Sequence, residues 1–187
     1  MALEIEKKYR LTKRQRASVL QRLTEIGASL LGAEFEVNTL YSGAELEVGK
    51  SILRLRRVGD KATLTYKERF PGGAIKYQRE DETVVNDPNA MKKILGALGF
   101  KPSLLYEKRR ETWTLGKIEI VIDELPFGLF MEIEGSEKGI RSTERKIGLK
   151  DLKVEPLTYP QLTLKHGQRK GKVIESRFTR ARRKVRL

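Results

Sequence analysis

The sequence contains no cysteine and a single histidine, His166, and both shortages narrow the chemistry open to the chain. Without cysteine there are no disulfides, thiolate metal ligands or thiol nucleophiles, a composition that fits the reducing cytoplasm. A single histidine also argues against a Ser-His-Asp triad and against a zinc site built from several histidines. Any chemistry must therefore come from carboxylates, lysines and arginines.

Long apolar runs are missing as well. No stretch approaches eighteen uncharged apolar residues, and the N-terminus lacks the apolar core of a signal peptide. We therefore expect a soluble, cytoplasmic protein without a membrane span. The 187 residues, of which 39% are apolar, are enough for one domain, or for one domain with an appendage.

The formal net charge of +14 is unevenly distributed along the chain. Residues 165–187 hold ten Lys or Arg and one Glu, so they carry +9 of the total. The rest of the chain is moderately basic and rich in carboxylates, which suggests an anionic small molecule handled with metal ions. The basic tail, residues 166–187, suggests contact with a polyanion such as nucleic acid or polyphosphate. A solvated or disordered arm, or a helix lying on the body, is the alternative for this tail.

Charges alternate with other residues in the first predicted strand. Glu4, Glu6 and Lys8 fall on one face because side chains alternate along a strand. Paired carboxylates suit Mg²⁺ or Mn²⁺, and the neighbouring Lys8 can hold an anionic oxygen bridged by the same ion. An exposed edge strand would show the same pattern, so this segment alone does not decide between the two readings.

The same alternation returns in strand after strand, which favours the functional reading. The side chains that share a strand face in this way are Arg54 and Arg56, Lys67 beside Thr63 and Thr65, Glu80 and Glu82, Lys108 and Arg110, Glu119 and Asp123, and Glu132 and Glu134. Such strands cannot pack as an ordinary sandwich, because charges would line its core. A closed antiparallel barrel solves this by turning apolar faces toward covering helices and charged faces toward a wet lumen.

Three segments predict helices that serve packing. Residues 14–26 have apolar side chains at helical spacing between Thr12, a predicted N-cap, and Gly27, a predicted stop. A second helix is predicted after Asp87-Pro88 and ends at Gly99, and a third covers residues 142–149.

The charged motifs together resemble the CYTH family, the triphosphate tunnel metalloenzymes. The similar segments are Glu4-x-Glu6-x-Lys8, Arg54-x-Arg56, Leu64-Thr65-x-Lys67, Glu80-x-Glu82, Lys108-x-Arg110 and the block Asp123-x-x-Pro126-x-Gly128-x-Phe130-x-Glu132-Ile133-Glu134. The resemblance spans about residues 2–165, so it implies a CYTH domain over 1–165 and a basic tail over 166–187. It implies an α+β fold, in which an eight-stranded antiparallel β-barrel closes into a tunnel with flanking helices.

The resemblance also implies roles for the charged residues. Metal ligands for Mg²⁺ or Mn²⁺ would be Glu4, Glu6, Glu132 and Glu134. Substrate would be bound by Lys8, Arg54, Arg56, Lys67, Lys108 and Arg110. The catalytic carboxylates that orient water would be Glu80, Glu82 and Asp123.

These roles predict metal-dependent hydrolysis of a triphosphate, either inorganic triphosphate or an organic one such as thiamine triphosphate or a nucleotide. A class IV adenylate cyclase, which makes cyclic AMP and pyrophosphate from ATP, is the first alternative. A non-catalytic module that binds polyphosphate or RNA is the second. The sequence leaves the oligomeric state open, a homodimer included.

One position departs from the family pattern. Members often carry an arginine two residues before the carboxylate pair, where this chain has Gln78. A β-bulge would re-aim the neighbouring Arg79, Lys76 would compensate, or one phosphate contact is absent.

Overall fold

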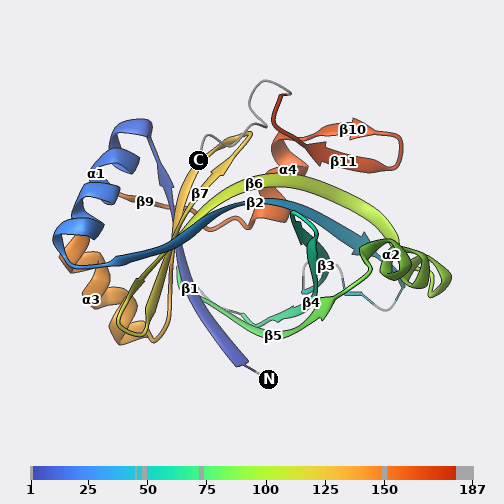
Figure 1. Cartoon of the computed structure of the whole chain (residues 1–187), viewed down its shortest axis with the longest axis horizontal. Helices are drawn as coiled ribbons and strands as arrows, with labels where there is room; N and C mark the ends of the chain where they lie inside the picture. Colours follow the sequence, from blue (N-terminus) through green and yellow to red (C-terminus); the bar gives the residue numbers. More distant parts are fainter. Residues whose placement is uncertain (1, 45, 48–49, 72–73, 149–150, 180–187) are drawn as a thin grey trace.

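Eight antiparallel strands close into a barrel in the computed structural model of the chain (Figure 1). Neighbouring strands follow the order β6-β2-β3-β4-β5-β1-β8-β7, and β7 pairs with β6 to complete the ring. The structure describes residues 2–44, 46–47, 50–71, 74–148 and 151–179. The predicted fold, a closed antiparallel eight-stranded barrel with flanking helices, is confirmed.

The elements follow one another along the chain with short connections. They are β1 (Ala2–Leu11), α1 (Lys13–Glu25), β2 (Ser29–Ser42), β3 (Ser51–Val58), β4 (Lys61–Arg69), β5 (Lys76–Val85), α2 (Pro88–Ala97), β6 (Lys101–Leu115), β7 (Ile118–Leu125), β8 (Gly128–Glu134), α3 (Glu137–Ile147), β9 (Lys153–Val154), α4 (Tyr159–His166), β10 (Gln168–Lys170) and β11 (Val173–Ser176).

Two strands, β1 and β6, each pair with two barrel strands, one on either edge, and these pairings close the sheet into a ring. Residues 2–6 of β1 pair with β5, whereas residues 6–11 pair with β8. Most of the length of β6 pairs with β2, and residues 109–115 of β6 also pair with β7. The alternation of side chains therefore runs around the whole ring and gives the barrel an inner and an outer face.

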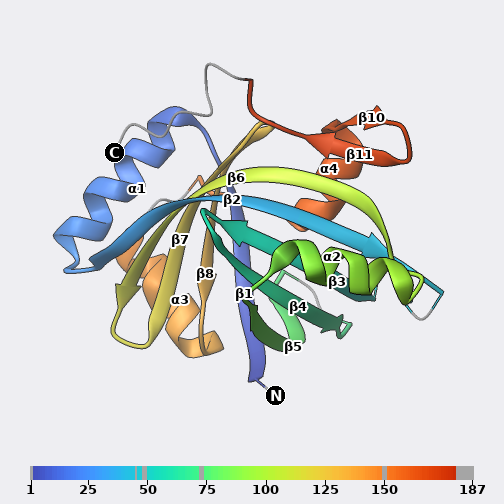
Figure 2. The same cartoon turned by 45° about the vertical axis from the view of Figure 1, so that its right-hand side comes forward.

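Helices α1 and α3 cover the outer face of β1, β7 and β8, and α2 lies at the opposite end of the molecule (Figure 2). The apolar cluster beneath α1 and α3 consists of Tyr9, Leu11, Val19, Leu23, Ile118, Ile120, Ile122, Met131, Ile133, Ile140 and Ile147. Burying each large apolar side chain contributes about 1.5–3 kcal/mol. Because these residues pack outside the ring, the lumen is left to charged side chains.

A second apolar cluster lies between α2 and the outer face of the strands that it covers. It contains Tyr41, Leu53, Leu55, Ala62, Val85 and Leu95. Leu53 and Leu55 alternate with Arg54 and Arg56, so packing of the leucines outside turns both arginines into the lumen.

Two of the three predicted helices lie close to where the sequence placed them. Helix α1 begins at Lys13 after a capping box built by Thr12 and Gln15, and α2 follows the N-cap Asp87. Helix α3 begins at Glu137, five residues before the predicted start, because the Ser136 side chain accepts a hydrogen bond from the Gly139 N–H and caps it. It ends at Ile147 and is capped by Gly148, which adopts a left-handed conformation with φ of 70°.

The first part of the basic tail forms a β-hairpin. Strands β10 and β11 pair with each other, and β11 pairs in parallel with β6 at Leu104–Tyr106. Beyond the hairpin, Phe178 is buried, and Glu107 on the outer face of β6 accepts hydrogen bonds from the Phe178 N–H and from Arg177. Neither a disordered arm nor a helix, the alternatives considered for the tail, therefore describes residues 168–178. The arginine-rich segment 180–187 lies outside the described residues.

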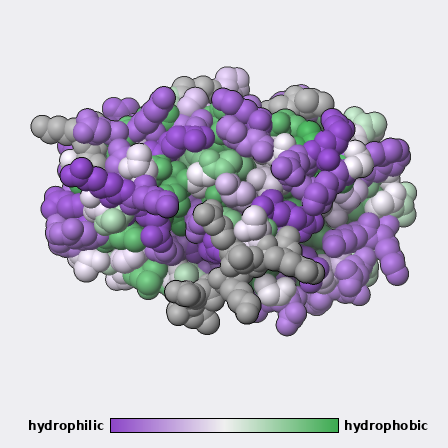
Figure 3. Space-filling model, turned by 90° about the horizontal axis from the view of Figure 1, so that it is seen from above, coloured by the Kyte–Doolittle hydropathy of each residue, from purple (hydrophilic) through white to green (hydrophobic). Residues whose placement is uncertain are grey.

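The face seen from above in Figure 3 is mostly hydrophilic, with small apolar areas between charged side chains. Among the described helices, none has the length and apolar character needed to cross a membrane.

Candidate active site

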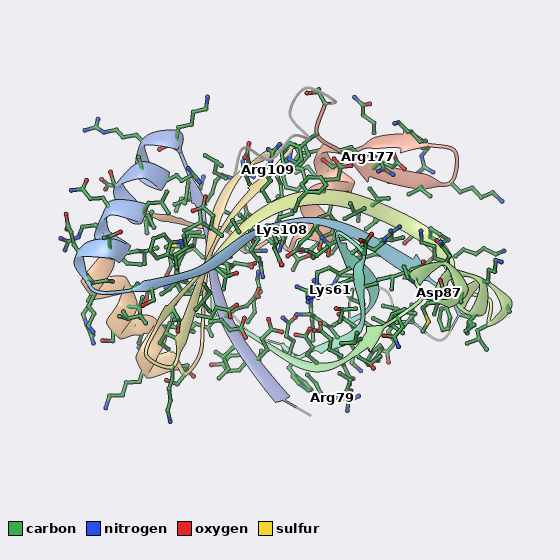
Figure 4. The ribbon with its side chains drawn as sticks, viewed as in Figure 1. Lys61, Arg79, Asp87, Lys108, Arg109 and Arg177 are labelled. Carbon is green, nitrogen blue, oxygen red and sulfur yellow. The ribbon has the colours of Figure 1, made fainter. Side chains whose placement is uncertain are left out.

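A cavity of about 420 Å³ lies inside the barrel and is lined by charged side chains of both signs. Twelve of the thirteen predicted site residues line it, namely Glu4, Glu6, Lys8, Arg54, Arg56, Lys67, Glu80, Glu82, Lys108, Arg110, Glu132 and Glu134. The remaining one, Asp123, is fully buried behind the cavity wall. Figure 4 shows Lys108 on the lumen side of the arc formed by β2 and β6. The structure therefore gathers the predicted residues, whereas their individual roles stay predictions.

The cations Lys8, Arg54, Arg56, Lys108 and Arg110, here called the basic wall, come from β1, β3 and β6. Arg110 donates two hydrogen bonds to Asp123, of 2.8 and 2.7 Å, and a third of 2.8 Å to Glu132. The Asp123 carboxylate also accepts a 2.7 Å hydrogen bond from the hydroxyl of Tyr159. Asp123 therefore fixes the Arg110 guanidinium, a position that suits orienting this arginine better than orienting water.

Two carboxylates deep in the basic wall stay ionised because cations surround them. Burial alone would raise the pKa of Glu132, but Lys8, Arg110 and Lys108 together lower it well below the usual range. The pKa of Glu36 is also lowered well below the usual range. Burial acts to raise it, but Lys108, Arg110 and Arg56 outweigh burial. Each charge in this part of the cavity has an opposite charge close by.

Two arginines of β3, Arg54 and Arg56, bind carboxylates of β5. Arg56 lies 2.9 Å from a Glu82 oxygen, and Thr65 donates a 2.8 Å hydrogen bond to the same oxygen. Arg54 lies 3.8 Å from Glu80 and 3.9 Å from Glu82, and its buried Nε has no hydrogen-bond partner among the described residues. Arg54 therefore keeps donor capacity that a phosphate oxygen would satisfy.

The charges are matched less well around Glu4, Glu6, Glu119 and Glu134, which also line the cavity and form what we call the acidic cluster. Lys67 lies 2.7 Å from oxygens of both Glu4 and Glu80, and Lys76 lies 3.1 Å from Glu6. These two lysines neutralise only part of the negative charge of the acidic cluster.

The pKa values of the acidic cluster show this shortage of positive charge. Burial, followed by repulsion from Glu4 and Glu119, raises the pKa of Glu134 to about 8. Burial and the neighbouring Glu80 carboxyl raise the pKa of Glu4 in spite of Lys67. A cation bound here would relieve the repulsion between these carboxylates.

The acidic cluster therefore fits a hard divalent cation in donor type and in charge. Mg²⁺ and Mn²⁺ prefer oxygen ligands, and the cluster offers carboxylate oxygens that repel one another. Among the described residues, no three acidic or histidine side chains already stand in the arrangement of a metal site. Metal binding would thus require Glu4 and Glu6 to exchange part of their lysine contacts for the ion.

Several residues in the lumen or buried in its wall were missed by sequence reasoning. Glu36 continues an alternation visible in the sequence, Glu34-x-Glu36, and could have been found from it. Arg69 follows Lys67 on the inner face of β4, although the predicted strand stopped at Lys67. Tyr159 reaches the cavity from α4, and no local sequence signal indicates this, because its position depends on how α4 packs against β6.

The departure at Gln78 is settled in part. Gln78 is buried and lines the cavity, whereas Arg79 points outward and pairs with Glu68 at 3.2 Å. Figure 4 shows Arg79 beyond β5, on the outer side of the barrel. No bulge interrupts the pairing of β5 with β4, so Arg79 is not re-aimed inward. Lys76 does turn toward the lumen side, where it binds Glu6.

Comparison with known proteins agrees with this geometry. The model of the CYTH domain matches residues 2–152. A protein of Methanocaldococcus jannaschii, whose name provisionally places it among the adenylate cyclases, is 26% identical over 146 residues, which cover 76% of this chain and 82% of that protein.

Solved structures share the fold. The PH1012 protein of Pyrococcus horikoshii is 28% identical with a TM-score of 0.72, and the match covers 83% of this chain and 96% of that one. A protein of Hippeastrum, described as an adenylyl cyclase candidate with a dominant triphosphatase activity, is 16% identical with a TM-score of 0.64 over 85% of this chain and 93% of its own. With the charged barrel and the match over residues 2–152, the chain belongs to the CYTH family.

Proposed function

We propose that the chain hydrolyses the terminal phosphoanhydride bond of a triphosphate inside the barrel, with the help of a divalent cation. The observation that carries this proposal is the mixed charge of the 420 Å³ cavity, which both the basic wall and the acidic cluster line. A site for a simple anion gains nothing from so many carboxylates, whereas a complex of metal and polyphosphate needs both kinds of group.

The basic wall would hold the phosphate chain. Arginines present planar pairs of N–H donors that match phosphate oxygens, and Arg54 has a buried donor to spare. Asp123 and Glu132 fix Arg110 from two directions, so this guanidinium is oriented before substrate arrives. Such preorganised donors stabilise charge that develops on phosphate oxygens as the bond breaks.

The acidic cluster would hold Mg²⁺ or Mn²⁺ through Glu4, Glu6 and Glu134, with Glu132 at its border with the basic wall. A divalent cation at such a site neutralises phosphate oxygens and polarises the bond to be broken. Enzymes of the family generally depend on divalent metal ions.

The attacking water would be oriented by a carboxylate near the phosphate chain. Glu82 is the favoured candidate because it lines the cavity and is held in place by Arg56 and Thr65. Glu80, which Lys67 holds at 2.7 Å, is the second. A carboxylate positioned in this way accepts a hydrogen bond from water and aligns it for in-line attack.

The direct test incubates the purified chain with inorganic triphosphate, ATP and thiamine triphosphate in Mg²⁺ or Mn²⁺, and resolves the products. We expect release of phosphate from at least one substrate, and its loss in EDTA. The Glu82→Gln variant should lose turnover, whereas the Arg79→Gln variant, altered on the outer face, should keep it. Tight binding of triphosphates without release of any product would contradict hydrolysis and favour a non-catalytic binding module.

Adenylate cyclase activity is the second candidate, favoured by the name of the relative from Methanocaldococcus jannaschii. In this reaction the ribose 3′-hydroxyl replaces water as the nucleophile and pyrophosphate leaves. Apolar side chains that line part of the cavity, Leu40, Ile52, Tyr106 and Pro160, offer a surface for an organic group. Formation of cyclic AMP and pyrophosphate from ATP in the same assay would make this the main activity.

Polyanion binding through the basic tail is an accessory proposal. Arg169, Lys170 and Lys172 are exposed on the β10–β11 hairpin, where they can meet the phosphates of a long polyanion without reading its sequence. Removing residues 179–187 and neutralising these three side chains should abolish salt-sensitive binding to long polyphosphate. Equal binding by the intact and altered proteins would reject this role.

A further inference from the structure

Arg69 differs from the other arginines that line the cavity. It lies at the end of β4, on the same face as Lys67 and Thr65, and its side chain lines the barrel cavity. Arg54, Arg56 and Arg110 each have a carboxylate oxygen within 4 Å, whereas Arg69 has none among the described residues. Its buried Nε also has no hydrogen-bond partner in the part of the chain that the structure describes.

The surroundings of Arg69 do not offset the cost of its burial. Burial lowers the pKa of Arg69, and the attraction of Glu6 and Tyr106 compensates only in part. In contrast, burial of Arg110 is outweighed by Asp123, Glu36 and Glu132, which raise the pKa of this arginine well above its usual value. A partly buried guanidinium with an unused donor is costly unless an anion joins it.

The residue directly opposite Arg69 is neutral. Arg69 pairs with Gln78 in the register of β4 and β5, and both side chains line the cavity. Residues opposite each other in an antiparallel pair have Cβ atoms about 4.5–5.5 Å apart, so a guanidinium on either strand reaches much the same space. Gln78 leaves that space without a positive charge of its own, and Arg79 faces outward.

We propose that Arg69 binds the triphosphate directly and supplies from β4 the guanidinium that Gln78 does not supply from β5. This inference rests on the proposed function, because it names a further substrate-binding residue in the same cavity. In the proposed contact, the Arg69 guanidinium donates two parallel hydrogen bonds to phosphate oxygens, because protein carboxylates do not engage its donors. An incoming phosphate has to compete with a protein carboxylate for Arg54, Arg56 and Arg110. Among the described residues that line the cavity, Arg69 is the arginine without such a competitor.

The test measures binding of inorganic tripolyphosphate by calorimetry in EDTA, where metal-dependent turnover is absent, for the intact chain and three variants. In Arg69→Gln the guanidinium is removed. The double variant Arg69→Gln with Gln78→Arg moves it to the opposite strand. Arg79→Gln removes a matched arginine from the outer face of the same barrel. Thermal unfolding of each variant checks that the fold is kept.

We expect Arg69→Gln to weaken tripolyphosphate binding about 10-fold or more, as the loss of a charged hydrogen-bonding group does. The double variant should recover most of the affinity, and Arg79→Gln should stay within about 2-fold of the intact chain, as surface changes usually do. Binding by Arg69→Gln as tight as that of the intact chain would overturn the proposal.

The outcomes separate this inference from the proposed function. If the intact chain binds tripolyphosphate and Arg69→Gln does not, but no triphosphate is hydrolysed in Mg²⁺ or Mn²⁺, hydrolysis fails and the role of Arg69 stands. If hydrolysis occurs and Arg69→Gln has unchanged affinity and unchanged kcat/KM, only the role of Arg69 fails. An intact chain that neither binds tripolyphosphate in EDTA nor hydrolyses any triphosphate in Mg²⁺ or Mn²⁺ would overturn both.

Discussion

The acidic cluster and the basic wall line the same cavity, but they differ in how well their charges are matched. In the basic wall, Glu36 and Glu132 have strongly lowered pKa values because cations surround them. In the acidic cluster, Glu4 and Glu134 have raised pKa values because burial and other carboxylates dominate. The protein thus completes its own ion pairs in the basic wall and leaves the acidic cluster short of positive charge.

This difference suggests a division of labour between the two regions. A preorganised region changes little when substrate binds, so it suits orientation of a phosphate chain. A region with excess negative charge is stabilised by a bound cation, so it suits a divalent metal ion. Substitutions in the basic wall and substitutions in the acidic cluster should therefore differ in the kind of effect they have.

The largest expected effect on stability comes from breaking the basic wall. Arg110→Ala removes both guanidinium hydrogen bonds from the fully buried Asp123 and one of the cations around Glu132. Loss of one member of a buried ion pair costs about 3–5 kcal/mol of unfolding free energy. Urea unfolding measures this cost. The control Arg141→Ala, at an exposed ion pair with Glu137, should change stability by less than about 1 kcal/mol. Similar effects of the two variants would contradict the buried network.

The next largest effect is on turnover, from the acidic cluster. Glu4→Gln removes a predicted metal ligand together with part of the repulsion at Glu134. Turnover should fall on the order of 100-fold or more, since a bound metal contributes several kcal/mol to the transition state. The melting temperature should hold or rise. An unfolded variant would show that Glu4 is structural, and unchanged turnover would end its role in metal binding.

Arg54→Ala tests the basic wall where its donors are least engaged. The variant should lose about 2–4 kcal/mol of transition-state stabilisation, as enzymes do when another preorganised donor is removed. The loss is measured as a decrease in kcat/KM. An effect below about 0.5 kcal/mol would be typical of a surface side chain and would exclude Arg54 from substrate binding.

The last prediction concerns the pH dependence of stability in metal-free protein. Between the usual pKa of a glutamate and about 8, folded Glu134 keeps a proton that the unfolded chain has released. Stability therefore falls as the pH rises through this window. Glu134→Gln cannot ionise, so its melting temperature should match the intact chain at pH 4 and exceed it at pH 8.5 in EDTA. A difference that does not vary with pH would rule out the raised pKa.

Much of the lumen could be predicted from the sequence because the side-chain period of a strand holds along the segments that carry the charged pairs. Leucines or isoleucines between the charges, as in Leu53-Arg54-Leu55-Arg56, determine which face turns outward. Local alternation of this kind is therefore enough to assign most of the charged side chains to the inner face.

The residues that were missed depend on longer-range geometry. Strand β4 continues to Arg69 because Glu68 and Arg69 pair with Arg79 and Gln78, a register that a single segment does not reveal. Asp123 shares the periodicity of the lumen residues but is covered by Arg110 and Tyr159, which come from other elements. The hairpin β10–β11 forms on an edge that β6 offers beyond its pairing with β7.

The most direct test of the division of labour is calorimetric titration of Mn²⁺ and of tripolyphosphate, each alone, into the intact chain, Glu4→Gln and Arg54→Ala. We predict that Glu4→Gln weakens Mn²⁺ binding and leaves tripolyphosphate binding intact or stronger, because it removes negative charge. Arg54→Ala should weaken tripolyphosphate binding and leave Mn²⁺ binding largely unchanged. Equal Mn²⁺ binding by the intact chain and Glu4→Gln, or loss of both ligands in both variants, would contradict the account.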